Sequence, residues 1–256
     1  MTGPAGGTPA VSPWLVCRQP RPQAALRLYC FPHSGGSPGE FLRWADELGQ
    51  TEIHGVQLPG RGSHVRAAPL DAMSEVVAGL LDSVTFRAPY AFFGHSLGGL
   101  TAYETARRLQ AAGRPGPEFV LVSACAPPHH PRDDGLRHLP DEDLLAAIDE
   151  RYGGGVPLAL HQDRAVRALL MGVFRADVCV SETYRHAPGP VLRSPLYVVG
   201  GRRDLPRELL AQWARYTTDR FQLTLLPGGH FYLREPDQHR ALLRLLTALT
   251  RSAAVR

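Results

Sequence analysis

Six short apolar segments recur along the chain, and each is rich in β-branched or aromatic residues. They span residues 26–31, 53–58, 90–93, 119–123, 196–199 and 221–226. In most of these segments the apolar residues are nearly continuous, whereas a strand with one solvated face would alternate apolar and polar residues. Continuous apolar runs of this length are typical of strands buried on both faces of a parallel sheet. The pattern therefore predicts a sheet covered by other elements on both sides.

Segments with helical periodicity lie between these strands. The expected helices span residues 39–48, 71–84, 96–110, 206–216 and 236–249. In the second of them, Met73, Val76, Val77, Leu80 and Leu81 recur at the spacing that places side chains on one helical face. Strands that alternate with helices indicate βαβ units. We expect an α/β protein with a mostly parallel central sheet and helices on both faces.

The stretch between residues 125 and 194 departs from this alternation. It contains a segment rich in proline and histidine (127–140), a helical pattern (141–151), three glycines (153–155) and a longer helix (161–183). A helical insertion of this length between two core strands predicts a lid, at about residues 126–190. Residues 1–13 are rich in Gly, Pro, Thr and Ala, and we expect them to be disordered. Residues 14–256 then form one domain.

Composition narrows the class of protein. The 256 residues are 44% hydrophobic and 20% charged, as in ordinary globular proteins, and the net charge of +4 rests on arginine alone because the chain contains no lysine. The arginines are scattered, whereas a nucleic-acid-binding protein would show a basic stripe. A mildly positive surface is compatible with an acidic partner protein. We expect no nucleic-acid partner.

Cysteine usage and hydropathy indicate the compartment. Cys17, Cys30, Cys125 and Cys179 form no C-x-x-C pair, and we expect free thiols. No apolar run reaches the roughly 18 residues that span a membrane, and the first residues lack the features of a signal peptide. The sequence therefore predicts no membrane association and a cytoplasmic location.

One glycine-rich turn contains a candidate nucleophile, Ser96. The segment 94–98 reads GHSLG, and it joins the strand predicted at 90–93 directly to the helix that follows. A tight strand-to-helix turn exposes the serine hydroxyl, and it requires small residues two positions before and after the serine; here these are Gly94 and Gly98. The alternative is an ordinary glycine-rich turn. The position of Ser96 between a buried strand and a helix favours the first interpretation, a serine hydrolase with the α/β-hydrolase fold.

In this fold the acid and the histidine follow the serine, with the acid first. His230 follows the last predicted strand and a Gly-Gly pair, whereas His239 lies within a predicted helix and His186 precedes the strand at 196–199. His230 is therefore the expected general base. Asp204 follows the strand at 196–199 and is the expected acid, with Asp177 as the rival. Asp204 also precedes a helix, so it is placed to interact with that helix's N-terminus.

Acyl-transfer chemistry also requires two backbone N–H donors for the oxyanion. Leu97, the residue after the serine, is one expected donor. The second is expected in the loop after the first strand, where residues 31–36 read FPHSGG; we expect Ser34, with Gly35 as second choice. His129, His130 and His138 lack the spacing of metal ligands, and the sequence predicts neither a metal nor a cofactor.

Four motifs in order resemble one known family. They are residues 30–36 (CFPHSGG), 57–62 (QLPGRG), 93–99 (FGHSLGG) and 229–233 (GHFYL), and two further segments, 175–177 (RAD) and 182–184 (ETY), also fit. The chain from about residue 14 to residue 249 resembles the type II thioesterases, the stand-alone partners of polyketide and nonribosomal peptide synthases.

The resemblance implies a proofreading hydrolase. Such enzymes release stalled or mis-primed acyl groups from the phosphopantetheine arm of an acyl or peptidyl carrier protein. The family's catalytic triad maps onto Ser96, Asp204 and His230, and its oxyanion donors map onto Ser34 and Leu97. Two positions depart from the family pattern, because Ser34 stands where alanine is commonest and Leu205 stands where proline usually follows the acid.

Two other functions are compatible with the same residues. A carboxylesterase or lipase acting on small free esters would use the same triad, because the chemistry does not reveal the leaving group. A non-catalytic α/β-hydrolase scaffold is the second alternative, although all three triad positions are filled. The sequence does not specify the acyl chain, the partner synthase or the position of the lid. We expect a monomer.

Overall fold

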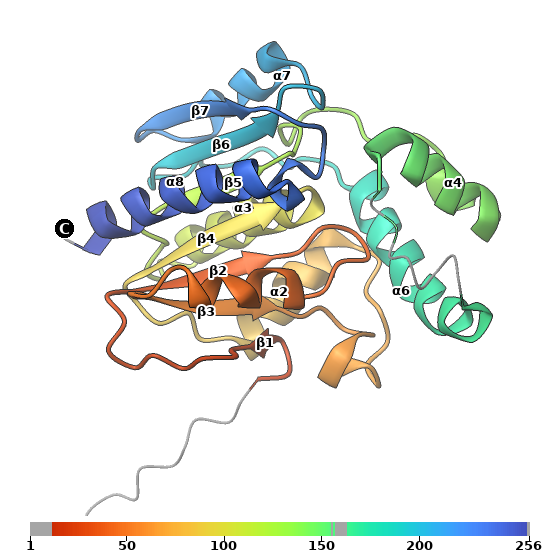
Figure 1. Ribbon diagram of the computed structural model, residues 1–256, viewed down its shortest axis with the longest axis horizontal. Helices are drawn as coiled ribbons and strands as arrows, with labels where there is room; N and C mark the ends of the chain where they lie inside the picture. The colour runs from red at the N-terminus through yellow and green to blue at the C-terminus, as the bar shows by residue number, and fades with distance from the viewer. Residues whose placement is uncertain (1–11, 155, 157–162, 255–256) are drawn as a thin grey trace, which may run out of the picture.

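The central element is a sheet of seven strands in the order β1-β3-β2-β4-β5-β6-β7. In the computed structural model, which describes residues 12–154, 156 and 163–254, β1 pairs antiparallel with β3 and every other neighbouring pair is parallel. The strands are β1 (Leu15–Val16), β2 (Leu26–Phe31), β3 (Thr51–Val56), β4 (Tyr90–His95), β5 (Val120–Ser123), β6 (Leu196–Gly201) and β7 (Phe221–Leu226). This arrangement confirms the predicted mostly parallel sheet (Figure 1).

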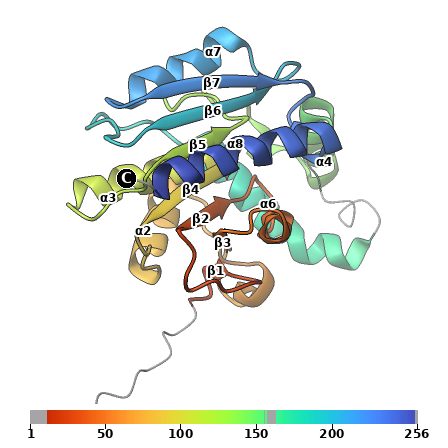
Figure 2. The same ribbon diagram turned by 60° about the vertical axis from the view of Figure 1, so that its left-hand side comes forward.

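Helices cover both faces of the sheet, as the continuous apolar strands predicted. One face packs against α1 (Gly39–Leu42), the 3₁₀ helix η1 (Arg43–Asp46) and the C-terminal helix α8 (Pro236–Ala254). The other packs against α2 (Met73–Ser83), α3 (Leu97–Ala111), α7 (Arg207–Ala211) and the 3₁₀ helix η4 (Gln212–Tyr216). Figure 2 shows α8 and the pair α2 and α3 on opposite sides of the sheet. Short 3₁₀ helices also occur at Gly62–His64 (η2) and Tyr232–Arg234 (η5).

Alternate side chains of each strand enter the two apolar layers. In β2, Leu28 and Cys30 face the α8 layer, whereas Tyr29 and Phe31 face the α3 layer. All four side chains are at most 1% exposed. β2 therefore buries both faces, which explains why its sequence lacks a regular polar alternation, whereas the edge strand β7 is only partly buried along its length.

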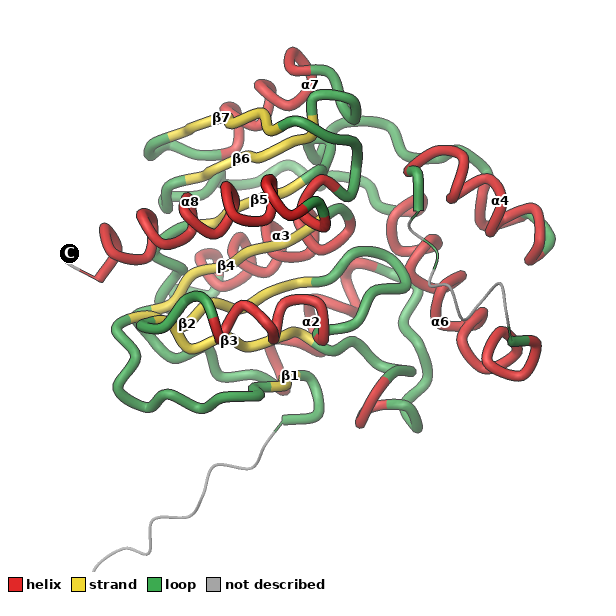
Figure 3. The backbone as a smooth tube through the Cα atoms, in the orientation of Figure 1, coloured by secondary structure: helices red, strands yellow, loops and turns green. Residues whose placement is uncertain are grey.

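A helical insertion separates β5 from β6, as predicted. It contains a 3₁₀ helix, η3 (Leu136–His138), followed by α4 (Asp141–Tyr152) and α6 (Arg164–Thr183). The arrowheads of β4 and β6 point toward α4 and α6, and Figure 3 shows both helices beyond the ends of the strands. We call these three elements the lid. The lid has its own small apolar cluster, formed by Leu144, Leu145, Ile148, Met171, Phe174 and Val178.

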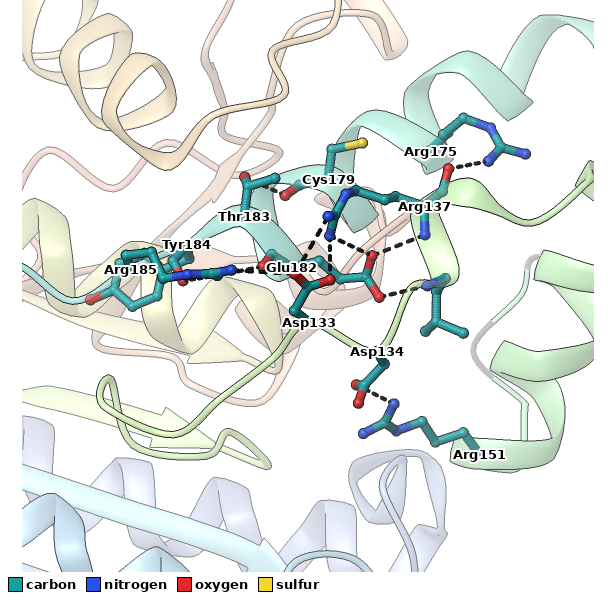
Figure 4. Close-up of polar contacts among 11 residues, drawn as sticks. Asp133, Asp134, Arg137, Arg151, Arg175, Cys179, Glu182, Thr183, Tyr184 and Arg185 are labelled. Atoms are coloured by element: carbon teal, nitrogen blue, oxygen red, sulfur yellow. Dashed lines mark hydrogen bonds and ion pairs between the residues drawn. The ribbon is translucent and has the colours of Figure 1, made fainter.

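Buried polar contacts near Glu182 hold the lid segments together. The Glu182 carboxylate, which is 3% exposed, accepts hydrogen bonds from the backbone N–H groups of Leu136 and Arg137 at 2.8 and 2.9 Å. Arg175 donates to the Arg137 carbonyl, as Figure 4 shows, and also to Asp141. It therefore connects α6 to η3 and α4. The segment 182–184, noted above for its resemblance, thus includes a residue that fixes the path of the chain after β5.

Several element boundaries differ from the sequence-based expectations. The segment expected as a strand at 53–58 is paired at Thr51–Val56, because polar Thr51 and Glu52 are buried in the sheet. The expected helix at 39–48 is a short α-helix followed by a 3₁₀ helix, and the one at 206–216 divides in the same way. The two-residue β1 was not predicted, since a strand of that length has no periodicity.

Most of the N-terminal segment that we expect to be disordered lies outside the described residues. Residues 1–11 of the segment 1–13 lie outside the described residues, as do the first two residues of the helix predicted at 161–183. Ser12 and Pro13 are described, and the Ser12 carbonyl accepts a hydrogen bond from the Leu15 N–H at 3.0 Å, so these two residues form an ordered turn. In the described ranges, no helix combines the length and the apolar character needed to cross a membrane.

Candidate active site

Ser96 occupies a strained turn between β4 and α3. Its φ of 55° and ψ of −122° lie in a region that L-residues other than glycine rarely adopt, at a cost of about 1–3 kcal/mol. The Ser96 N–H donates to the Ser123 carbonyl at 2.8 Å, and its carbonyl accepts from the Gly99 N–H at 2.9 Å. These bonds hold the turn between two buried strands and the first turn of α3.

The glycines on either side of Ser96 are required by close backbone approach. A Cβ on Gly94 would overlap the backbone of Gly98, and a Cβ on Gly98 would overlap the carbonyl group of Phe31. The pattern of small residues in this turn therefore has a direct steric cause. It brings Ser96 beside the loop that follows β2.

His230 and Asp204 come from neighbouring loops at the same edge of the sheet. The His230 Nδ1 atom lies 3.1 Å from each carboxylate oxygen of Asp204. The loops after β6 and β7 approach so closely that a Cβ on Gly201 would overlap the Gly229 carbonyl. The structure therefore brings together the histidine and the acid expected from chain order.

Aromatic rings surround the imidazole of His230. The ring of Tyr152, the last residue of α4, lies 4.4 Å from it between centroids, and the rings of Phe231 and His95 lie at 5.0 and 5.2 Å. His230 is only 6% exposed. The lid thus takes part in enclosing this histidine, which the sequence did not indicate.

A cavity of about 140 Å³ opens between the sheet and the lid. Ser96, His230, Ser34 and Leu97 all line it. Its apolar lining comes from both the sheet side and the lid and includes Leu100, Ala126, Leu136, Ile148, Phe174 and Val178. Four of the five residues expected to perform the chemistry therefore border one mainly apolar cavity. Asp204 does not line this cavity but contacts the imidazole of His230.

The two backbone amides expected to bind an oxyanion, those of Ser34 and Leu97, have no hydrogen-bond acceptor among the described residues, whereas the amide of Gly35 has one. Leu97 is the first residue of α3, so its N–H has no acceptor within the helix. Within the described residues, the Ser34 N–H donates to no protein group. The Gly35 N–H, the second choice from the sequence, donates to Asp177 at 2.7 Å and is thus already engaged. Ser34 and Leu97 are the pair with free amides.

Asp177, the rival acid, has a different set of partners. Its carboxylate binds the Arg61 guanidinium at 2.6 and 2.8 Å, and both side chains are almost fully buried. Sequence reasoning assigned no role to Arg61. The two residues are 116 positions apart, so no local pattern connects them.

Two further buried histidines lie at the site, His33 in the lining of the cavity and His95 beside the ring of His230. Burial lowers the pKa of His33 to about 4 and lowers that of His95 well below its usual range, so both rings are neutral near pH 7. The His95 Nδ1 contacts Ser123 Oγ at 2.8 Å, and that hydroxyl contacts the Tyr232 hydroxyl at 2.7 Å. These polar groups support the floor of the site.

His129, one of the histidines considered for metal binding, already has protein partners. Both ring nitrogens of His129 contact side chains, Tyr216 at 2.7 Å and Gln212 at 2.8 Å. A different group, Cys17, Glu52 and His54, has possible ligand atoms within 4.8 Å of one another.

The carboxylate of that second group is already occupied. Glu52 accepts a hydrogen bond from the Arg21 N–H, contacts His54 at 3.0 Å and lies 3.2 Å from the Arg27 guanidinium, which disfavours a cation. The four cysteines are free, as expected; Cys30 and Cys125 are buried, whereas Cys17 and Cys179 are partly exposed.

Comparison with known proteins gives consistent matches. The family model described as a thioesterase domain matches residues 26–250. Thioesterase PikA5 of Streptomyces venezuelae is 36% identical over 229 residues, which cover 87% of this chain and 80% of PikA5.

Solved structures match over similar lengths. The RedJ thioesterase from the prodiginine pathway of Streptomyces coelicolor superposes with a TM-score of 0.82 at 34% identity, covering 88% of this chain and 86% of RedJ. The type II thioesterase BorB from the borrelidin cluster gives 0.79 at 30% identity, covering 93% of this chain and 96% of BorB.

The steric account of the turn predicts opposite effects for two Gly→Ala substitutions. Gly98→Ala places a methyl group against the Phe31 carbonyl and lowers the free energy of unfolding by roughly 1–3 kcal/mol. Gly172→Ala, on the open side of α6, raises it by about 0.5–1 kcal/mol because alanine loses less backbone entropy in a helix. Urea unfolding of both variants measures the difference, and equal shifts would contradict the account.

The buried neutral His33 predicts a pH dependence of stability. Its pKa is lower in the folded chain, about 4, than the ordinary value of 6.5, so the unfolded chain takes up the proton first as pH falls. From pH 7 to pH 5 the wild type therefore loses ~2 kcal/mol more of its free energy of unfolding than His33→Gln does. Urea titrations of both proteins at the two pH values test this. Identical pH dependence in both proteins would show that His33 is not buried in its neutral form.

Proposed function

The chain belongs to the thioesterase family and is a hydrolase of thioesters, and from this premise we propose that it releases acyl groups from the phosphopantetheine arm of a carrier protein. The proposal assigns it to the editing of a polyketide or nonribosomal peptide synthase, where such groups are stalled or mis-primed. Relatives whose names refer to these pathways support it, including the gramicidin S biosynthesis protein GrsT of Aneurinibacillus migulanus and the yersiniabactin type II thioesterase YbtT.

One observation carries the assignment of roles. Ser96 stands in a strained turn at the start of α3 and shares a cavity with His230, whose Nδ1 contacts both oxygens of Asp204 at 3.1 Å. We assign Ser96 as the nucleophile, His230 as the general base and Asp204 as the group that orients the imidazole and stabilises its protonated form.

The first half of the reaction forms an acyl-enzyme. Ser96 Oγ attacks the thioester carbonyl carbon while its proton passes to His230 Nε2. The oxyanion of the tetrahedral intermediate accepts hydrogen bonds from the Ser34 and Leu97 amides, and the positive end of the α3 dipole favours the same charge. The intermediate collapses, the carbon–sulfur bond breaks, and the leaving thiolate takes the proton from His230.

The second half restores the serine. A water molecule gives a proton to His230 Nε2 as its oxygen attacks the ester carbonyl, and a second oxyanion forms at the same two amides. Collapse releases the free acid, and the proton returns from His230 to Ser96 Oγ. The lid encloses His230 through Tyr152 and supplies part of the apolar lining that receives the acyl group. No metal or cofactor is needed at any step.

The cytoplasmic location and the monomeric state remain predictions. The experiments that follow test the carrier-bound substrate against small free esters, and the role of Ser96 against the alternative of a non-catalytic scaffold.

Ser96→Ala removes the proposed nucleophile, and we expect the rate of hydrolysis to fall by roughly 10⁶-fold. Mass spectrometry of carrier proteins loaded with different acyl groups, before and after exposure to enzyme, measures deacylation directly. The matched control is Ser37→Ala, an exposed serine in the loop after β2, which we expect to retain wild-type activity.

The leaving group is tested in the same series. We expect a higher kcat/KM for the acyl-carrier protein than for a nitrophenyl ester with the same acyl group. Equal values would identify a general esterase, and unchanged hydrolysis by Ser96→Ala would remove the nucleophile assignment. Absence of hydrolysis by the wild type on every substrate would favour the non-catalytic scaffold.

A further inference from the structure

Helix α6 of the lid makes direct contact with the loop that carries Ser34. The Gly35 N–H donates to Asp177 Oδ2 at 2.7 Å. On the same helix, the Phe174 ring lies so close to Gly35 that a Cβ at this position would overlap it. Gly35 has a φ of +71°, which glycine adopts without strain. Two independent contacts therefore hold this glycine against α6.

Arg61 joins a second loop to the same carboxylate. Its Nη1 donates to Asp177 Oδ2 at 2.8 Å and to the Gly36 carbonyl at 3.0 Å, and its Nη2 donates to Asp177 Oδ1 at 2.6 Å. Arg61 and Asp177 are 8% and 2% exposed. The Asp177 carboxylate thus accepts three hydrogen bonds in a nearly dry environment, where charge-assisted bonds are strong.

α6 also packs against the loop that carries Arg61. A Cβ on Gly60, whose φ is +85°, would lie 2.9 Å from Val173 Cγ2. Val173, Phe174 and Asp177 are on one face of α6, and together they contact the loops after β2 and β3. The lid helix and both loops therefore form one packed unit.

We propose that Asp177 is a positioning residue that, through Gly35 and Arg61, fixes the Ser34 amide in the oxyanion hole, so that the hole is complete only while α6 is docked. The inference rests on the proposed function, because it takes Ser34 as an oxyanion donor. It assigns to Asp177 a role that differs from that of the triad acid.

The geometry of the peptide bond explains how the contact between Gly35 and Asp177 restrains the Ser34 amide. The peptide group between Ser34 and Gly35 is planar, so the bond from the Gly35 N–H to Asp177 fixes the orientation of that whole plane. Only the two backbone dihedrals of Ser34 then separate the fixed plane from the Ser34 N–H. The bond from Arg61 to the Gly36 carbonyl restrains the other side of Gly35. Movement of α6 away from the sheet breaks the bond from the Gly35 N–H to Asp177 and takes from Arg61 the carboxylate that orients its guanidinium.

Asp177 acts on a different part of the site from Asp204. Both of its oxygens are bound by Arg61 and Gly35, whereas His230 Nδ1 is bound by Asp204. Loss of Asp177 is therefore expected to change transition-state stabilisation without changing the protonation of His230.

Asp177→Asn is the first test. It keeps the size of the side chain but removes the charge that Arg61 binds. We expect kcat for acyl-carrier hydrolysis to fall by about 10²-fold, the effect of a displacement near 1 Å in a catalytic group, with KM within about twofold of wild type. The pH dependence of kcat/KM is expected to stay at its wild-type midpoint.

A second readout measures the oxyanion hole itself. A boronic acid carrying the acyl group forms a tetrahedral adduct with Ser96, and we expect its affinity for Asp177→Asn to fall by the same factor as kcat/KM. A non-hydrolysable amide analogue of the acyl-carrier substrate reports ground-state binding, and its affinity is expected to be unchanged.

Two other variants distinguish loss of this contact from general loss of folding. One disrupts the contact at Gly35, and the other is a control elsewhere on α6. Gly35→Ala leaves the Arg61–Asp177 pair intact but places a methyl group against the Phe174 ring, and we expect the same loss of kcat and of boronic acid affinity. Arg175→Gln removes an interaction of α6 with η3 and α4, two residues from Asp177, and is expected to keep wild-type kcat.

The outcomes separate this proposal from the proposed function. If Ser96→Ala is inactive but Asp177→Asn and Gly35→Ala keep their kcat, or lose activity only through KM, the positioning role is overturned. A shifted pH midpoint in Asp177→Asn would also overturn it, because Asp177 would then act on His230. If Ser96→Ala remains active, the proposed function fails instead.

Discussion

The close approach of three backbone segments at Ser96 is the constraint on which the rest of the site depends. The turn holds Ser96 in a left-handed conformation only because Gly94 and Gly98 have no side chains to separate β4, α3 and the end of β2. The same proximity places the loop after β2 within reach of the serine. Without it, the amides of Ser34 and Leu97 would not border one cavity. The strain at Ser96 is therefore balanced by the packing of the sheet around it.

The parallel sheet explains how distant residues meet at this turn. Parallel strands end at one edge, so the loops after β2, β4, β6 and β7 lie together although they are spread over some 200 positions of the chain. The acid and histidine loops touch at Gly201 and Gly229, which sets the distance between Asp204 and His230. The lid then covers this edge, and its contacts extend to the histidine through Tyr152 and to the oxyanion loop through Asp177.

Much of this arrangement could be predicted from the sequence because it follows from local patterns. The continuous apolar strands required a sheet covered on both faces, and the serine turn, the Gly-Gly before His230 and the position of Asp204 after a strand identified the candidate site. The lid helices were visible as helical periodicity between two strands.

What could not be predicted depends on contacts between distant segments. Glu52 is a buried strand residue because the Arg21 N–H and the Arg27 guanidinium lie beside its carboxylate, and neither residue is near position 52 in the sequence. Asp177 is bound by Arg61, 116 positions away, and by the Gly35 N–H, 142 positions away. Only these two contacts together show that the Gly35 amide is engaged and that Asp177 is not the partner of His230. Tyr152 closes over His230 only because α4 folds back across the site.

The central claim is that Ser96 holds the acyl group during turnover, and rapid quenching of the reaction with an acyl-carrier substrate tests it most directly. After digestion, mass spectrometry locates any acyl adduct on the enzyme. The account predicts a mass increase equal to the acyl group on the peptide that contains Ser96, and its loss when quenching is delayed until the substrate is exhausted. An adduct on another residue, such as the cavity-lining Cys125, would contradict it.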